Sequence, residues 1–249
     1  MDDLTYSNSA ELCEQISRKC DTALLAFSTG KDSIAAWLQM RKYFKRIVPY
    51  YKYCVPGLKF VEDNLKYYED FFGCHIWRMP HPSFFRWMRS GIDQPPDRLK
   101  YIFEHLYVDA KQYTDETIGE ILRYNLDLPE DSYVGVGVRM ADSPMRRVSI
   151  KSYGAVNHNR KSFYPVYDWL KADLLREFDE AGVKLPTDYR YFGNTFDGLT
   201  YKYVKPMRDH FPEDYQHLLE WFPFADLEIA RYEGLDKIDT KRVEQDGMA

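Results

Sequence analysis

Cysteine is scarce in this sequence, and every cysteine lies in the first third of the chain. The four are Cys13, Cys20, Cys54 and Cys74, and none of them forms a Cys-x-x-Cys pair. This spacing indicates neither a disulfide framework nor a zinc site, so we expect reduced thiols. His, Asp and Glu residues show no metal-ligand spacing either, and no metal site is predicted. The chain after residue 74 offers no thiol nucleophile.

Long apolar runs and an excess of positive charge are also missing. No segment approaches the roughly 18 consecutive apolar residues of a membrane span. The start, MDDLTYSNSAELCEQ, is too acidic and polar for a signal peptide. We therefore expect a cytoplasmic protein with no membrane partner. The net charge of −5 excludes a global basic field for a long nucleic acid and leaves a local basic patch open.

Hydrophobic residues make up 45% and charged residues 29% of the 249 residues, which is typical of a globular chain. In the first third of the sequence, short apolar runs typical of buried strands alternate with helical patterns. The expected strands cover residues 22–27, 46–53 and 74–80, and the expected helices cover 9–20, 34–44 and 60–73. This alternation predicts an α/β fold with a parallel sheet flanked by helices on both faces.

The pattern changes between residues 81 and 130, where helical periodicity and a Pro-Pro pair predict a helical insertion. A strand pattern returns over 132–139, and a turn followed by an amphipathic helix is expected over 164–186. Further helical patterns follow in a Tyr-rich tail. We expect one nucleotide-binding α/β domain over residues 1–190 and a helical C-terminal extension over 191–249, packed on it.

The first expected strand runs into a short polar loop, STGKDS (28–33), which leads directly into a helix. Such a connection directs main-chain N–H groups and the positive end of the helix dipole to one point, which favours an anion. The hydroxyls of Ser28, Thr29 and Ser33 and the ammonium group of Lys31 would add donors, and Gly30 would let a ligand approach closely. A plain strand–helix turn with a serine cap is the alternative interpretation.

The common phosphate loop G-x-x-x-x-G-K-[ST] does not fit this stretch. Leu25 stands at the position of its first glycine, and Asp32 follows the lysine. A carboxylate suits a helix N-terminus but would repel a phosphate tail unless it faces another group. The loop therefore favours a reaction other than γ-phosphate transfer.

A second candidate site follows the expected strand 132–139. It contains three arginines, an aspartate and a serine, namely Arg139, Asp142, Ser143, Arg146 and Arg147. Guanidinium groups suit phosphate or sulfate oxygens, and ligands of open α/β sheets bind beyond the carboxyl ends of the strands. Gly135 and Gly137 weaken the strand and indicate close approach of a ligand. Arg160 and Lys161 add positive charge, and a solvated basic loop is the alternative.

Four segments, in order, resemble motifs of the adenine nucleotide α-hydrolase (PP-loop ATP pyrophosphatase) superfamily. STGKDS is similar to its S-[GT]-G-K-D-S loop, and GLKFVE (57–62) to its G-x-x-F-x-E segment. GVRMADSPMRR (137–147) resembles G-x-R-x-x-[ED]-S-x-x-R, and YPVYDWLKADLL (164–175) resembles P-x-x-D-W-x-x-x-D-[VL]. The branch resembled is that of phosphoadenosine-phosphosulfate reductases and the small catalytic subunit of ATP sulfurylase. The resemblance spans about residues 22–190 and implies a Rossmann-like (HUP) fold.

The resemblance also implies a substrate and site residues. ATP or a related nucleotide would be cleaved between its α and β phosphates, releasing pyrophosphate and passing the adenylyl group to an unknown acceptor, sulfate being one candidate. The implied catalytic residues are Lys31, Asp32, Arg139 and Arg146. The implied nucleotide-binding residues are Phe27, Ser28, Thr29, Gly30, Lys31, Asp32, Ser33, Tyr53, Val55, Gly57, Gly137, Arg139, Asp142, Ser143 and Arg147. We expect ATP with Mg²⁺ and no iron–sulfur cluster.

Two departures from the family pattern keep other functions open. The reductases use a C-terminal cysteine that this chain lacks, and Val55-Pro56-Gly57 stands where the family often has Asp-Thr-Gly. One alternative is a nucleotide-binding subunit with reduced catalysis in a nucleic-acid-processing or defence complex. Another is a sulfonucleotide reductase that uses a partner's thiol. A partner subunit, a homodimer and a nucleic-acid ligand are all left open.

Overall fold

The computed structural model describes residues 4–106 and 112–234 and divides them into two compact units. The first unit contains residues up to 53, residues 64–79 and residues 112–186, and the second contains residues 54–63, 80–106 and 187–234. The expected insertion and C-terminal extension include residues 107–111 and 235–249, which lie outside the described residues. The domain boundary at residue 190 stays a prediction.

The first unit is an α/β layer structure around one sheet, which confirms the expected fold class. Its strands are β1 (Thr22–Ala26), β2 (Arg46–Tyr53), β3 (Trp77–Pro80), β4 (Val134–Val136), β5 (Val156–Asn157) and β6 (Ser162–Phe163). Its helices are α1 (Ser9–Lys19), α2 (Lys31–Met40), α6 (Asp115–Asn125), α7 (Pro144–Tyr153) and α8 (Lys171–Ala181), with most of α3 (Lys59–Phe72).

The sheet has the strand order β3-β2-β1-β4-β6-β5. β1 is parallel to both β2 and β4, with Leu24 opposite Val48 on one side and Val134 on the other. β4 is parallel to β6, and β5 is antiparallel to β6. The chain order reverses direction between β1 and β4. In open α/β sheets this reversal opens a crevice beyond the carboxyl ends of the two strands, where ligands bind.

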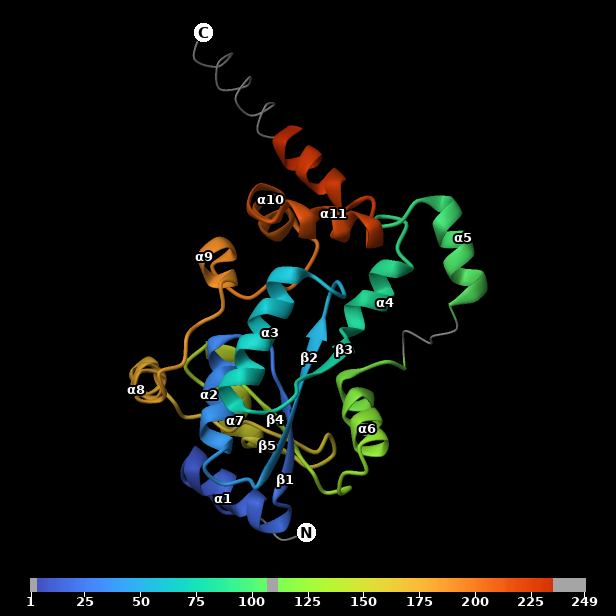
Figure 1. Cartoon of the computed structure of the whole chain (residues 1–249). Helices are drawn as coiled ribbons and strands as arrows, with labels where there is room; N and C mark the ends of the chain where they lie inside the picture. The colour runs from blue at the N-terminus through green and yellow to red at the C-terminus, as the bar shows by residue number, and fades with distance from the viewer. Residues whose placement is uncertain (1–3, 107–111, 235–249) are drawn as a thin grey trace. The chain divides into compact units, whose positions relative to one another are not determined.

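Alternate residues of β1 face opposite layers, as strand geometry requires. Leu24 packs with Ile118 and Leu122 of α6 in one core cluster. The ring of Phe27, which follows β1, packs edge-on against Trp37 of α2. In Figure 1, α6 lies on one side of the sheet and α1 and α2 on the other. The carboxyl end of β1 therefore has an α2 side and an α6 side.

α7 and the short β5–β6 hairpin were not anticipated from the sequence. Ser143 caps α7 by accepting a hydrogen bond from the Arg146 N–H (3.1 Å), and Pro144 occupies the first helical turn. A capping serine followed by proline is a helix-start signal that could have revealed α7. Ile150 is the only residue of α7 that is buried, and every other residue of this basic helix is exposed.

The second unit is helical within its described residues, with α4 (Pro82–Met88), α5 (Pro96–His105), α9 (Asp188–Phe192), α10 (Tyr201–His210) and α11 (Pro212–Trp221). The buried Asp214 carboxylate accepts hydrogen bonds from the N–H groups of Lys59 (2.5 Å) and Phe60 (3.1 Å), so it caps the first turn of α3. The Phe60 ring packs against Phe211. These contacts give the segment 57–62 a structural role within this unit.

Gly137 brings the end of β4 against the first turn of α2. A Cβ atom at residue 137 would lie 2.5 Å from the carbonyl carbon of Asp32 and 2.6 Å from the Ser33 nitrogen. Both atoms belong to the main chain, so a larger residue at position 137 fits only if the backbone moves. The sequence analysis expected a ligand to approach this glycine, whereas in the structure the backbone of α2 occupies the space.

We expect Gly137→Ala to lower the free energy of unfolding by about 1–3 kcal/mol, because the added methyl group overlaps main-chain atoms of α2. Gly119→Ala is the matched control. Its Cβ would meet neighbours no closer than 3.4 Å, so removing a helical glycine should cost nothing or stabilise by up to about 1 kcal/mol. Urea denaturation of both variants tests this, and equal stability of Gly137→Ala and wild type would contradict the close contact.

Candidate functional site

The loop between β1 and α2 folds back over the first turn of the helix. The Ser33 hydroxyl donates to the Gly30 carbonyl (2.9 Å) and accepts from the Ser28 N–H (3.2 Å). The hydroxyls of Ser28 and Ser33 lie 3.3 Å apart. Gly30 is the N-cap of α2 and supplies no side-chain cap. An uncapped helix N-terminus surrounded by hydroxyls favours an anionic group.

Thr29 holds the loop in a strained conformation. Its φ angle is +59°, in the left-handed region that β-branched residues rarely adopt. The residue is buried, and its hydroxyl donates to the Ser28 carbonyl (2.6 Å). Strain of this kind persists only where the surrounding structure imposes it, and it concentrates at binding and catalytic sites. Thr29 therefore identifies this loop as a candidate site independently of its sequence motif.

Arg139 connects the loop to the end of β4. The residue is 5% exposed, and its Nε donates to Asp32 Oδ1 (2.6 Å) while its Nη2 donates to Asp142 Oδ1 (2.7 Å). Its Nη1 makes a longer bond to the Trp169 carbonyl (3.4 Å). The guanidinium group thus joins the α2, β4 and 164–170 segments of the chain. Two carboxylates compensate its charge, which is what a cation needs when it is removed from water.

The other predicted charged residues of the motif differ in exposure. Asp142 also accepts from the Arg139 N–H (3.1 Å) and from Nη1 of the exposed Arg146 (2.9 Å). Arg147 is exposed on α7, and Lys31 is partly exposed with its Nζ 3.2 Å from Asp32 Oδ2. Arg146, Arg147 and Lys31 are therefore the cations that solvent or a ligand can reach. Arg139, by contrast, is buried.

A cavity of about 250 Å³ opens on the α6 side of the sheet, at the carboxyl ends of β1, β2 and β4. Ala26, Tyr50, Val136 and Val138 contribute to its apolar wall. This is the side that the alternation along the strands assigns to them, because Gly135 and Gly137 face α2. Ala26, which lines the cavity, stands two residues before the loop 28–33, and no residue of that loop lines the cavity.

Charged residues border this cavity, and sequence reasoning did not include Lys52, Asp115 or Glu116 in the site. Lys52 Nζ lies 2.7 Å from Asp115 Oδ1, and Arg160 Nε lies 2.9 Å from Glu116 Oε1. Each pair joins a sheet-side residue to α6. The acidic residues at the start of α6 and the lysine near the end of β2 were visible in the sequence, but their pairing depends on how α6 covers the sheet.

Phe27 and Tyr53 lie in different environments. The Phe27 ring is buried between Trp37 and Tyr68, with centroid distances of 4.9 Å and 5.1 Å, so its ring belongs to the core. Tyr53 ends β2 and is half-buried, and burial raises the pKa of its hydroxyl. A nucleotide contact from Phe27 would have to use its main chain, whereas Tyr53 keeps some exposed side chain.

Val55 and Gly57 belong to the second unit, unlike the rest of the predicted site. Val55 is buried. Gly57 has a φ of +74°, and the preceding Pro56 carbonyl accepts a hydrogen bond from His217 Nε2 (2.9 Å). Their nucleotide-binding roles stay predictions.

The segment 164–170 meets the arginine motif, as the Met140 N–H donates to the Tyr167 carbonyl (2.8 Å). Asp168 Oδ2 accepts from the Ser9 N–H (3.2 Å), and Asp168 Oδ1 is buried without a hydrogen-bond partner among the described residues. Three of the four motif segments therefore come together in the first unit. Sequence reasoning had named this segment without assigning it a contact.

All four cysteines are free thiols. Burial raises the pKa of the Cys13 thiol, with Asp168 adding to the effect, and burial also raises the pKa of Cys74. A raised pKa reduces the thiolate fraction on which cysteine reactivity depends. These two thiols are therefore poor nucleophiles.

No protein-family model matches the chain, and no curated protein matches it. Solved structures with a similar fold include the following two. The U34-tRNA thiolase NcsA from Methanococcus maripaludis, with its [4Fe-4S] cluster, is 10% identical over 88% of this chain and 79% of its own, with a TM-score of 0.42. A predicted subunit of tRNA methyltransferase from Methanocaldococcus jannaschii is 18% identical over 78% of this chain and 92% of its own, with a TM-score of 0.34. Neither similarity establishes a family for this chain.

The expected absence of an iron–sulfur cluster is contradicted by the [4Fe-4S] cluster of the Methanococcus structure, and that part of the cofactor expectation is withdrawn. ATP with Mg²⁺ stays a prediction. Within residues 4–106 and 112–234, no group of three or more His, Cys, Asp and Glu side chains is arranged to hold a metal ion. Over the same residues, no helix has the length and apolar character needed to cross a membrane.

We expect Arg139→Met to lower the free energy of unfolding by about 3–5 kcal/mol, because it leaves Asp32 and Asp142 without their buried counter-ion. Arg147→Met, on exposed α7, is the control and should change stability by no more than about 0.5 kcal/mol. Thermal and chemical denaturation measure both. A small effect of Arg139→Met would show that the ion pairs contribute little to stability.

Proposed function

We propose that this chain binds an adenine nucleotide across the carboxyl ends of β1 and β4. Its phosphates would lie at the N-terminus of α2, within reach of the Ser28 and Ser33 hydroxyls and the ammonium group of Lys31. Its nucleoside would enter the cavity of about 250 Å³ on the α6 side. The single observation that carries the proposal is the strained loop over an uncapped helix N-terminus at the reversal of strand order.

The reaction we propose is cleavage of ATP between its α and β phosphates, with pyrophosphate as leaving group and adenylyl transfer to an acceptor. The resemblance of STGKDS to the PP-loop supports this choice over γ-phosphate transfer. The structure adds that Asp32 is engaged by Arg139 and Lys31. The Asp32 carboxylate is therefore compensated and does not repel the phosphates as a free carboxylate would. In this proposal Arg139 positions the loop, and Lys31 and Arg146 contact the nucleotide.

A second candidate function is nucleotide binding without turnover. One observation favours it: Arg139, which the resemblance implies is catalytic, is buried and already held by two carboxylates. A buried arginine whose partners are both carboxylates stabilises the site. To stabilise the negative charge of a transition state, it would first have to break its hydrogen bonds to those carboxylates. The two functions differ in turnover and not in affinity.

Incubation with ATP labelled at the α and γ positions distinguishes the two functions. The enzymatic proposal expects labelled pyrophosphate together with AMP or an adenylylated product. Orthophosphate and ADP as the only products would exclude it. Nucleotide binding with no product, over incubations with sulfate and other oxyanion acceptors, would support the binding function.

We expect Lys31→Ala to weaken nucleotide binding about 10- to 100-fold, the effect of removing one charge-assisted hydrogen bond of about 1.5–3 kcal/mol. Lys42→Ala is the matched control. Lys42 lies just beyond the other end of α2 and pairs with Glu177 (2.7 Å), so its loss should leave affinity unchanged. Calorimetric titration with a non-hydrolysable ATP analogue measures both. Equal affinities of the two variants would contradict the placement of the phosphates at the N-terminus of α2.

A further inference from the structure

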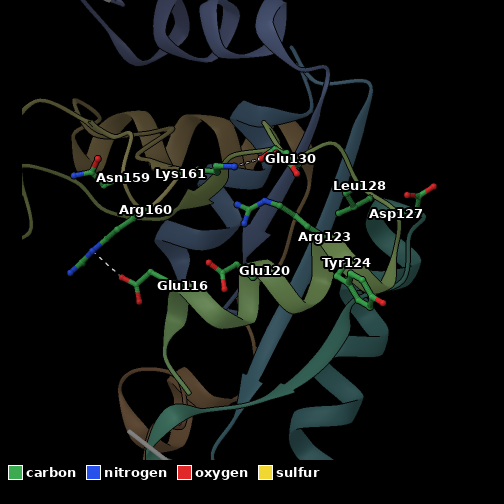
Figure 2. A pocket seen from close by; sticks show the side chains of 10 residues that line it. All are labelled: Glu116, Glu120, Arg123, Tyr124, Asp127, Leu128, Glu130, Asn159, Arg160 and Lys161. Atoms are coloured by element: carbon green, nitrogen blue, oxygen red, sulfur yellow. Dashed lines mark hydrogen bonds and ion pairs between the residues drawn. The ribbon is translucent and has the colours of Figure 1, made fainter. Parts of the chain in front are cut away.

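A second cavity, of about 520 Å³, lies along α6 next to the turn between β5 and β6. Its volume falls within the usual range of small-molecule sites, roughly 300–1,000 Å³. Figure 2 shows side chains of α6 on one side and Asn159, Arg160 and Lys161 on the other. Glu116 and Arg160 line both this cavity and the smaller one at the strand ends. Arg160 and Lys161, which the sequence analysis named as added positive charge, line it, and none of the implied catalytic or nucleotide-binding residues does.

Arg123 lines this cavity and has one buried donor without a partner among the described residues. Its Nε donates to the Ser132 carbonyl (2.9 Å), and its Nη2 is buried with no partner among the described residues. The guanidinium lies beside Gly119, where a Cβ would be 3.4 Å from Nη1. Burial lowers the pKa of Arg123. A partly desolvated guanidinium with unused donors favours an incoming carboxylate or other oxyanion.

Negatively charged side chains also surround Arg123. Glu120, one turn earlier on α6, is exposed and acts on Arg123 through its charge, and Figure 2 shows it beside the guanidinium. The cavity is lined by three cationic side chains, Arg123, Arg160 and Lys161, and by four carboxylates, Glu116, Glu120, Asp127 and Glu130. A purely anionic ligand would face more carboxylates than cations, and a purely cationic ligand would leave Arg123 unsatisfied.

We propose that this cavity binds a small zwitterion of the α-amino acid type, with its carboxylate on Arg123 and its ammonium group on Glu120. The ion pairs already present set this orientation. Arg160 is engaged by Glu116 (2.9 Å), and Lys161 donates to the main-chain carbonyl of Glu130 (2.8 Å), so Arg123 is the cation left for a carboxylate. Glu120 is chosen for the ammonium group because it is the carboxylate whose charge acts on Arg123 and which lies beside its guanidinium. The proposal stands on the second cavity and does not require nucleotide binding.

Ligand-observed NMR with the set of proteinogenic L-amino acids tests the proposal on the full chain. The best binder is then compared with two analogues, one lacking the amino group and one lacking the carboxylate. We expect each analogue to bind at least about 10-fold more weakly, a difference of about 1.4 kcal/mol. Failure of every amino acid to bind would overturn the proposal, and so would an analogue that binds as tightly as its parent.

Variants locate the site. Arg123→Met and Glu120→Gln should each weaken binding about 10-fold or more, since each removes one charged partner of the ligand. Arg18→Met is the matched control, because Arg18 pairs with Glu14 one turn earlier on the exposed face of α1 (2.6 Å). If Arg123→Met unfolds, Glu120→Gln still decides, because Glu120 is exposed. Lys31→Ala should leave amino acid binding intact, which separates this site from the proposed nucleotide site. Equal binding by Glu120→Gln and wild type would contradict the assignment.

Discussion

The buried ion pairs of Arg139 with Asp32 and Asp142 fix the relative positions of the parts that make up the candidate site. Asp32 is in the first turn of α2, Arg139 follows β4, and Asp142 precedes α7. Without the guanidinium, two carboxylates would face each other at the strand ends, and their repulsion would separate α2 from the 139–142 turn. The site residues that remain accessible are arranged around this buried centre.

The alternation of side chains along parallel strands divides the site into two chemically different sides. On the α2 side lie the loop, the helix N-terminus and the arginine network. On the α6 side lie the apolar cavity and a rim of charged pairs. A ligand with a polar end and an apolar end can contact the α2 side and the α6 side together only if it lies across the strand ends. That geometry suits a nucleotide better than a simple anion or a simple hydrophobic ligand.

Local patterns predicted the fold well, because strands and helices of the first unit are short and strongly patterned. The bounds of β2, residues 46–53, are those expected, and the loop 28–33 does lead directly into a helix. The pairing of Arg139 with Asp32 could not be predicted, since the two residues are 107 positions apart in the sequence. Alternate residues of a strand point to the same side, so the Phe27 ring, one residue past β1, could have been predicted to lie in the core with Leu25. The second cavity was also beyond prediction, because it depends on how α6 covers the sheet.

Gly135 and Gly137 leave one face of β4 without side chains at alternate positions, and Met40 and the Asp32 backbone occupy that space. α2 can therefore lie nearer to the strand than the usual spacing between a helix layer and a sheet allows. The electric field of a helix end falls off within about one turn. A thinner layer brings the positive end of α2 nearer to the rim where β1 and β4 finish. The two glycines thus strengthen the electrostatic attraction of the rim for an anion without adding any charged residue.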